Sequence, residues 1–199
     1  MTLIWKRSAM ALMILFSGFL WSGSSWAVTT IEFGPQETEI KASIKYTVIG
    51  QYVAGFDKFK GVISFNPQTG EILSVDLQIE SGSIHSNCKT CDNIVRSPQL
   101  LDTARFETIT FKSSSIITDQ SGYRVVGTLD MHGQKREMSF PFEAVIVEGA
   151  GAEQNILDIK GKWIINRKEF DIVWNRLLDK GGVLVGNHIT VKWGIKTVI

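Results

Sequence analysis

Apolar and polar residues alternate along most of the chain, and this alternation predicts β-strands. In residues 40–48, Ile40, Ala42, Ile44, Tyr46 and Val48 share one face, while lysine, serine and threonine occupy the other. Such alternation gives a strand one dry and one wet face, which is typical of an antiparallel sheet. The same pattern predicts strands at 59–65, 73–80, 106–117, 123–131, 138–146, 157–165 and 189–195, with a short one at 170–174.

Turn-forming residues separate these strands and indicate how they are connected. Glycine, proline, asparagine and aspartate gather at 66–70, 119–122, 132–133 and 180–182. Such clusters between alternating segments are typical of hairpins. Eight strands joined mainly by hairpins, each with one apolar face, close most simply into an antiparallel barrel. We therefore predict an all-β, eight-stranded antiparallel barrel.

One connection is too long for a hairpin. Residues 81–105 span 25 positions, and loops of that length usually carry function or structure of their own. Short helical turns are predicted over 92–101, with Pro98 limiting their length. We expect this partly helical segment to lie across one mouth of the barrel.

The predicted interior suits either a filled core or a ligand cavity. Large apolar residues point inward on every strand, and an eight-stranded barrel is either filled by side chains or hollow enough for one ligand. The alternation places Gly61, Gly127 and Gly161 at inward-facing positions, where the absence of a side chain leaves volume in the interior. The pattern alone leaves both interpretations open.

The N-terminal residues have the pattern that is typical of a signal peptide. Lys6 and Arg7 precede an uncharged apolar run of 13 residues, and Ser25 and Ala27 are the small residues that signal peptidase requires before a cut at Val28. The run is too short to span a bilayer, which needs about 20 residues. We predict a signal peptide at 1–27, one domain at 28–199, and a periplasmic or secreted protein.

Cleavage would leave 19 basic and 20 acidic residues, because residues 1–27 contain two basic residues and no acidic one. A chain without a basic excess is a poor candidate for binding nucleic acid or an anionic membrane surface, because both rely on summed positive charge. No later segment is long and apolar enough to cross a membrane. The sequence leaves a homodimer open.

Cys88 and Cys91 are the two cysteines of the chain, and both lie in the long connection. A local disulfide is the favoured interpretation for an exported protein. Covalent haem attachment is disfavoured because Asp92, not histidine, follows Cys91. Two alternatives stay open: a metal site that adds His85, and a periplasmic thiol-redox module.

Enzyme chemistry has little support in the sequence. The chain has three histidines, at 85, 132 and 188, and contains no nucleophile elbow, zinc-protease motif or phosphate-binding glycine-rich loop. We therefore predict a binding protein without catalytic residues, cofactor or metal.

Several short motifs follow one another in a fixed order along the chain. They are the segments 43–48 (SIKYTV), 55–61 (GFDKFKG), 83–84 (SI), 96–98 (RSP), 101–102 (LD), 106–111 (FETITF), 127–133 (GTLDMHG), 166–172 (NRKEFDI) and 185–191 (VGNHITV). Their order and spacing resemble the YceI-like family of polyisoprenoid-binding domains, and the resemblance extends over about 31–198.

This resemblance implies a lipocalin-like barrel that holds a long isoprenoid chain, for example that of a quinone precursor or polyprenyl phosphate. Two positions depart from the family pattern: Ile49-Gly50 follows the first strand where a histidine is common, and Cys88 and Cys91 replace a stretch that usually contains Thr and Arg-Asp. Head-group contacts there are therefore not carried over. The predicted lipid contacts are the large inward residues Ile44, Tyr46, Val48, Phe65, Leu77, Phe111, Leu129, Phe140, Phe142, Trp163, Trp174 and Trp193.

Overall fold

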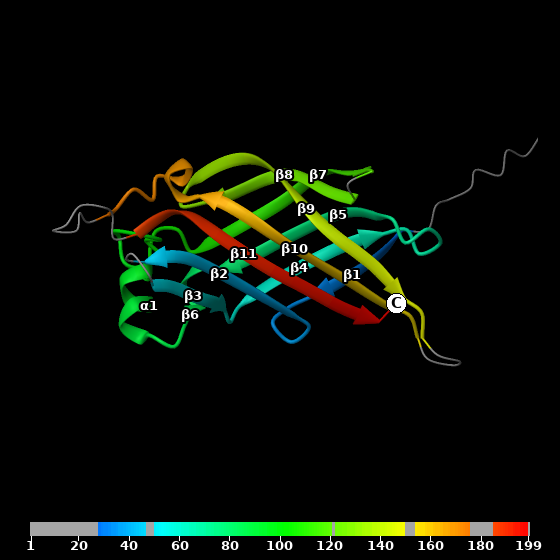
Figure 1. The fold of residues 1–199 in the computed structure, drawn as a ribbon, viewed down its shortest axis with the longest axis horizontal. Helices are drawn as coiled ribbons and strands as arrows, with labels where there is room; N and C mark the ends of the chain where they lie inside the picture. Colours follow the sequence, from blue (N-terminus) through cyan, green and yellow to red (C-terminus); the bar gives the residue numbers. More distant parts are fainter. Residues whose placement is uncertain (1–27, 47–49, 121, 150–153, 176–184, 199) are drawn as a thin grey trace, which may run out of the picture.

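The computed structural model describes residues 28–46, 50–120, 122–149, 154–175 and 185–198. The predicted signal peptide lies outside the described residues. Figure 1 shows a strongly curled antiparallel sheet with the helix α1 (Lys89–Arg96) at one end. The strands are β1 (Thr29–Phe33), β2 (Thr38–Tyr46), β3 (Gly50–Phe56), β4 (Phe59–Phe65), β5 (Ile72–Glu80), β6 (Ile84–His85), β7 (Thr108–Asp119), β8 (Gly122–Met131), β9 (Gln134–Val147), β10 (Ile156–Asn166) and β11 (Val185–Val198).

The strand pairings form a ring of eight chain segments. Three of these segments are broken in two: β1 with β2, β3 with β4, and β5 with β6. The segment 50–65 pairs with 29–46 on one side and with 72–85 on the other. β5 pairs with β7, each strand from β7 to β10 pairs with the next along the chain, and β11 pairs back with β2. The predicted eight-stranded antiparallel, lipocalin-like barrel is confirmed, although the breaks raise the number of strands in the described residues to eleven.

The strands of the structure differ from the predicted strands at several places, each for a local reason. β1, β3 and β6 are absent from the predicted strands, since they are short or interrupted by glycine.

The strand predicted at 170–174 does not form. Residues Arg167–Phe170 make a 3-10 helix, begun by the Asn166 side chain, which accepts a hydrogen bond from the Lys168 amide. Asp171 then takes a left-handed conformation with φ 58° and ends the helix.

A bulge also shifts the inward face of β5. Ser64 pairs with Ser74, but Phe65 pairs with Ile72, so Leu73 is the extra residue. Ile72 is fully buried, whereas Leu73, predicted to point inward, is exposed. Ile146 near the end of β9 is likewise exposed instead of inward.

The long connection 81–105 is partly helical, as predicted. It contains a 3-10 turn (Ser81–Ser83), β6 and the helix α1 (Lys89–Arg96). The helix begins three residues before the predicted turns because Cys88 Sγ accepts a hydrogen bond from the Cys91 amide, at 3.2 Å. Among the described helices, none has the length and apolar character needed to span a membrane.

Candidate functional site

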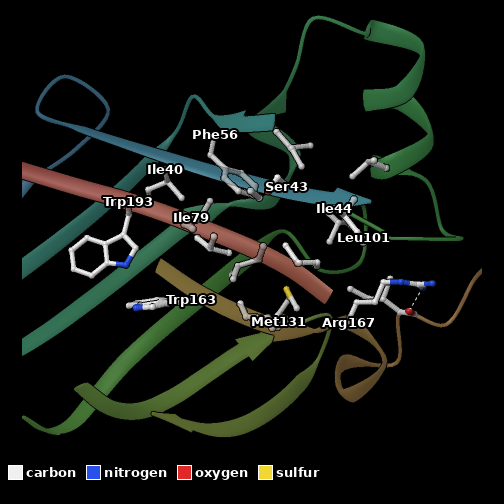
Figure 2. A pocket seen from close by; sticks show the side chains of 18 of the residues that line it. Ile40, Ser43, Ile44, Phe56, Ile79, Leu101, Met131, Trp163, Arg167 and Trp193 are labelled. Atoms are coloured by element: carbon white, nitrogen blue, oxygen red, sulfur yellow. Dashed lines mark hydrogen bonds between the residues drawn. The ribbon is translucent and has the colours of Figure 1, made fainter. Parts of the chain in front are cut away.

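The barrel is hollow at the end where α1 lies. A cavity of about 260 Å³ occupies this end. Figure 2 shows side chains from opposite sides of the sheet converging on it, with Trp163 and Trp193 at one end and Arg167 and Leu101 at the other. The strand residues around it are almost all apolar, as the alternating sequence predicts. They include Ile40, Ala42, Ile44, Phe56, Val75, Leu77, Ile79, Ile109, Leu129, Met131, Ile165, Ile189, Val191 and Ile195.

An aromatic cluster forms the floor of this cavity. The rings of Phe140 and Trp163 stack with their centroids 4.1 Å apart. Phe111 and Trp193 each approach Trp163 at 5.4 Å, the latter edge-on. Phe111, Trp163 and Trp193 line the cavity, whereas Phe140 lies behind them. Because interlocked aromatic rings fill volume without voids, this cluster ends the cavity part-way down the barrel.

Beyond the floor, the barrel is filled by side chains. The buried core there includes Ile63, Phe65, Ile72, Val125, Phe142, Leu157 and Ile159, none of which lines the cavity. Three of the predicted lipid contacts do not line the cavity: Phe65 and Phe142 belong to this filled end, and Phe140 supports the floor. Alternation predicts which side chains point inward, but not how far along the barrel the interior is occupied.

Eight of the twelve predicted contacts do line the cavity. They are Ile44, Tyr46, Leu77, Phe111, Leu129, Trp163, Trp174 and Trp193. Val48, another predicted contact, lies outside the described residues. Tyr46 lies at the mouth, since 46 % of its surface remains exposed.

The inward glycines do not enlarge the cavity, contrary to the expectation from their phase. Each lies beneath an aromatic ring. A Cβ atom on Gly61 would come within 2.0 Å of the Phe33 ring, and one on Gly161 within 2.7 Å of the Trp193 indole. One on Gly127 would come within 2.4 Å of the Lys112 carbonyl oxygen and 2.8 Å of the Phe111 ring. The volume that these glycines vacate is therefore occupied by rings and, at Gly127, also by backbone.

The roof of the cavity comes from the connection 81–105, whose contacts are missing from the predicted set. Ile84, Cys91, Ile94, Val95, Leu100 and Leu101 face the cavity from this segment. Cys91, Ile94 and Val95 have the i, i+3, i+4 spacing of one helix face. This spacing in the sequence indicates that α1 has one apolar face. In the structure that face lies over the mouth of the cavity.

Buried polar contacts hold this roof in place. The Asp92 carboxylate is 3 % exposed and accepts hydrogen bonds from the Tyr52 hydroxyl at 2.7 Å, from the Ser86 amide at 3.0 Å and from the Ser86 hydroxyl. Burial tends to raise the pKa of the Asp92 carboxyl, but the bonds from Ser86 and Tyr52 outweigh it and lower the pKa. Burial, with the bond to Asp92, raises the pKa of Tyr52. This network ties α1 to β3.

Arg96 anchors the other end of α1. Its guanidinium donates to the carbonyl of Gly82 at 3.0 Å and to that of Ile84. Both carbonyls lie in the segment that leads into the helix. The roof is therefore fixed at its first turn by Asp92 and at its last turn by Arg96.

Cys88 and Cys91 are joined by a disulfide. The bond closes the first turn of α1 and links no other element. A metal site at these cysteines would require free thiolates, whereas a disulfide is also the oxidised state of a thiol-redox pair. His85 contacts the Asp57 carboxylate at 3.0 Å. Among the described residues, no group of three or more His, Cys, Asp or Glu side chains is placed to hold a metal ion.

Arg167 is a fully buried cation at the edge of the cavity. It donates to the backbone carbonyls of Gly186 at 2.8 Å and Trp174 at 2.9 Å, and also to those of Val185 and Ile172. Burial lowers the pKa of its guanidinium. These bonds connect the segment after β10 to the start of β11, so Arg167 organises the mouth of the cavity.

The polar groups around the cavity are used by the protein or covered. Ser43 donates to the Thr190 carbonyl, Tyr52 to Asp92, and Arg167 to carbonyls. Thr38 Oγ1, Trp163 Nε1 and Trp193 Nε1 have no hydrogen-bond partner among the described residues, but neighbouring atoms bury them. The surface offered to a ligand is therefore hydrocarbon and aromatic.

Comparison with known proteins places these features in one family. The model of the YceI-like domain matches residues 32–197. Among curated relatives, the UPF0312 protein SA2479 of Staphylococcus aureus (strain N315) is 26 % identical over 168 residues, which covers 81 % of this chain and 93 % of the relative.

Solved structures share the fold at low sequence identity. BcnA of Burkholderia cenocepacia has a TM-score of 0.66 and 21 % identity, over 81 % of this chain and 96 % of its own. The YceI protein of Campylobacter jejuni has a TM-score of 0.65 and 18 % identity, over 78 % and 90 % of the two chains. A polyisoprenoid binding domain from Saccharophagus degradans, implicated in plant cell wall breakdown, has a TM-score of 0.58 and 11 % identity, over 87 % and 100 %.

Proposed function

The chain belongs to the YceI-like family, and from this we propose that it is a binding protein, not an enzyme, for a polyisoprenoid or a similar amphipathic lipid. The hydrocarbon chain of the lipid lies in the cavity between the aromatic floor and α1. Ligands of this class include a quinone precursor and a polyprenyl phosphate. No cofactor is required for this role.

The observation that carries the proposal is a cavity whose accessible wall is apolar. Its polar neighbours Ser43, Tyr52 and Arg167 already bond to the protein. Transfer of hydrocarbon from water into such a space is favourable by about 0.8 kcal/mol per CH2 group, so a few isoprene units supply enough free energy for binding. A polar head group gains no comparable partner inside, which favours its position at the mouth.

Export is part of the proposal. A cleaved signal peptide at 1–27 would deliver the domain to the periplasm or outside the cell, where the disulfide is stable. Determining the N-terminus of the protein from cell fractions tests this directly. A mature protein that begins at Val28 supports export, whereas an intact Met1 on a cytosolic protein contradicts it.

Native mass spectrometry of the purified protein, followed by lipid extraction, tests the ligand. We expect a mass above that of the polypeptide and an extractable prenyl lipid. Protein stripped of lipid should then take up an added prenyl lipid in preference to a straight-chain fatty acid. A protein that is consistently empty and ignores prenyl lipids contradicts the proposal.

A further inference from the structure

The outer wall of the barrel carries a row of three lysines on adjacent strands. Lys162 on β10 pairs directly with Lys192 on β11, and Lys192 pairs directly with Lys41 on β2. Residues in direct register point to the same face of a sheet, and all three lysines are exposed. Figure 1 shows β10, β11, β2 and β3 together on one side of the barrel, with α1 at one end.

Such a row is unfavourable for the isolated fold. Like charges directly opposite one another on neighbouring strands destabilise a sheet. Some lysines elsewhere on the barrel have acidic neighbours: Lys112 on β7 is the register partner of Asp76 on β5, and Lys135 on β9 contacts Asp130 at 3.8 Å. The arrangement of the row is therefore not explained by stability.

The acidic residues of this wall neutralise only one lysine of the row. Glu39 pairs with Lys41 at 2.7 Å, while Asp158 pairs with Lys196 and Glu143 with Lys160. Lys162, Lys192 and the nearby Lys45 form no ion pair with any carboxylate in the described part of the chain. The wall thus keeps an excess of positive charge after its ion pairs are formed.

Exposed aliphatic side chains lie next to the lysines. The neighbouring row runs in register from Ile164 through Thr190 and Ser43 to Val53. Ile164 is 58 % exposed and Val53 47 % exposed. Toward the helix end the same wall reaches Lys45 and then Tyr46, which lines the cavity mouth.

We propose that this wall, defined by Lys41, Lys45, Lys162, Lys192, Ile164 and Val53, docks on a bilayer that contains anionic phospholipid. Lysine side chains reach lipid phosphates at the ends of flexible apolar stems, and exposed aliphatic groups enter the interface between head groups and acyl chains. The whole chain has a formal net charge of only +1, so the attraction must come from this local surface. Docking in this way would bring the edge of the cavity mouth to the membrane.

Sedimentation with phospholipid vesicles tests the proposal. The wild-type protein should bind vesicles of phosphatidylcholine with phosphatidylglycerol, and it should bind pure phosphatidylcholine much less. The triple variant Lys41→Gln/Lys162→Gln/Lys192→Gln should lose on the order of 10- to 100-fold in binding to the anionic vesicles. Added salt should abolish the wild-type preference because it screens exposed charges.

The matched control is Lys60→Gln/Lys112→Gln/Lys135→Gln, which removes the same charge from exposed positions on β4, β7 and β9. It should keep most of the binding. The row variant should also be at least as resistant to heat as the wild type, because it relieves like-charge repulsion, so lost binding would not reflect unfolding.

Equal losses in the two triple variants would overturn the proposal, as would a wild-type protein that does not distinguish anionic from neutral vesicles. If the wild-type protein does not distinguish the two kinds of vesicle, an acidic protein would be the remaining candidate partner for this wall. The vesicles contain no isoprenoid, so the result is independent of whether the cavity binds a prenyl chain.

Discussion

The indole of Trp193 covers the backbone of Gly161, its direct partner across β10 and β11. A Cβ atom on Gly161 would lie 2.7 Å from three atoms of the indole, including Nε1. Only glycine at this position lets the ring lie flat enough to reach Trp163 and complete the cavity floor. The floor therefore depends on a missing side chain as much as on the aromatic ones.

We expect Gly161→Ala to destabilise the protein by about 1–3 kcal/mol, because the indole must move in a packed interior. Trp193 would be displaced, so the intrinsic tryptophan fluorescence should change as well. Chemical denaturation followed by fluorescence measures both effects.

Gly194→Ala is the control in the same ladder. Its Cβ would find its nearest atoms at 3.8 and 3.9 Å, which is ordinary contact. Its stability should stay within about 0.5 kcal/mol of wild type. Equal losses from the two substitutions would show that the Gly161 contact is not responsible.

Filling the cavity should reduce lipid binding without unfolding the protein. Leu77→Trp adds volume at a lining position, whereas Gln78→Trp adds the same residue type at the next position, which is exposed. We expect lower lipid occupancy for Leu77→Trp and normal occupancy for Gln78→Trp, measured by native mass spectrometry. Unchanged occupancy in a folded Leu77→Trp protein would place the ligand elsewhere.

The Asp92 network should make stability depend on pH in the acidic range. The pKa of Asp92 is lowered in the folded protein, whereas an unfolded aspartate has a pKa of about 3.9. The ionised carboxylate therefore stabilises the fold above about pH 4, and this contribution is lost as the pH falls through the folded pKa.

Asp92→Asn should remove this contribution and cost about 1–3 kcal/mol at neutral pH, since the Tyr52 and Ser86 groups lose a charged acceptor. Its unfolding free energy should fall less steeply than that of wild type below pH 4. Urea unfolding at several pH values checks both expectations, and parallel curves for the two proteins would contradict the assignment.

The disulfide should matter less than this network. Cys88→Ser/Cys91→Ser opens a loop within a single helical turn, which restricts the unfolded chain little, and Asp92 and Arg96 still hold the roof. We expect a melting temperature within a few degrees of wild type and an unchanged metal content.

Tyr52→Phe, which cuts the link between α1 and β3, should release bound lipid faster than the double cysteine variant does. The reverse order would make the disulfide the main constraint on the roof.

The sequence predicted the barrel well because alternation reports directly on which side chains point inward. It therefore placed Leu129, Trp163 and Trp193 correctly on the cavity wall. It did not predict that Phe142 lies in the filled end of the barrel, because depth along the barrel depends on which strands pair and in what register. The alternation predicted that Leu73 points inward, but a single-residue bulge turns it outward. Ile84 and Leu101 line the cavity from an irregular segment that has no alternation of apolar and polar residues.

Pairing between β2 and β11 also has a consequence for synthesis of the protein. Thr38 meets Ile195, so the ring joins residues from near opposite ends of the described chain. Until the last strand leaves the ribosome, β2 and β10 are open edges beside an exposed apolar face, which is a state prone to aggregation. Such long-range closure is slow for a folding chain. We expect truncation before Val185 to yield aggregates instead of a smaller stable barrel, and a nascent chain of this kind to depend on chaperones until β11 is made.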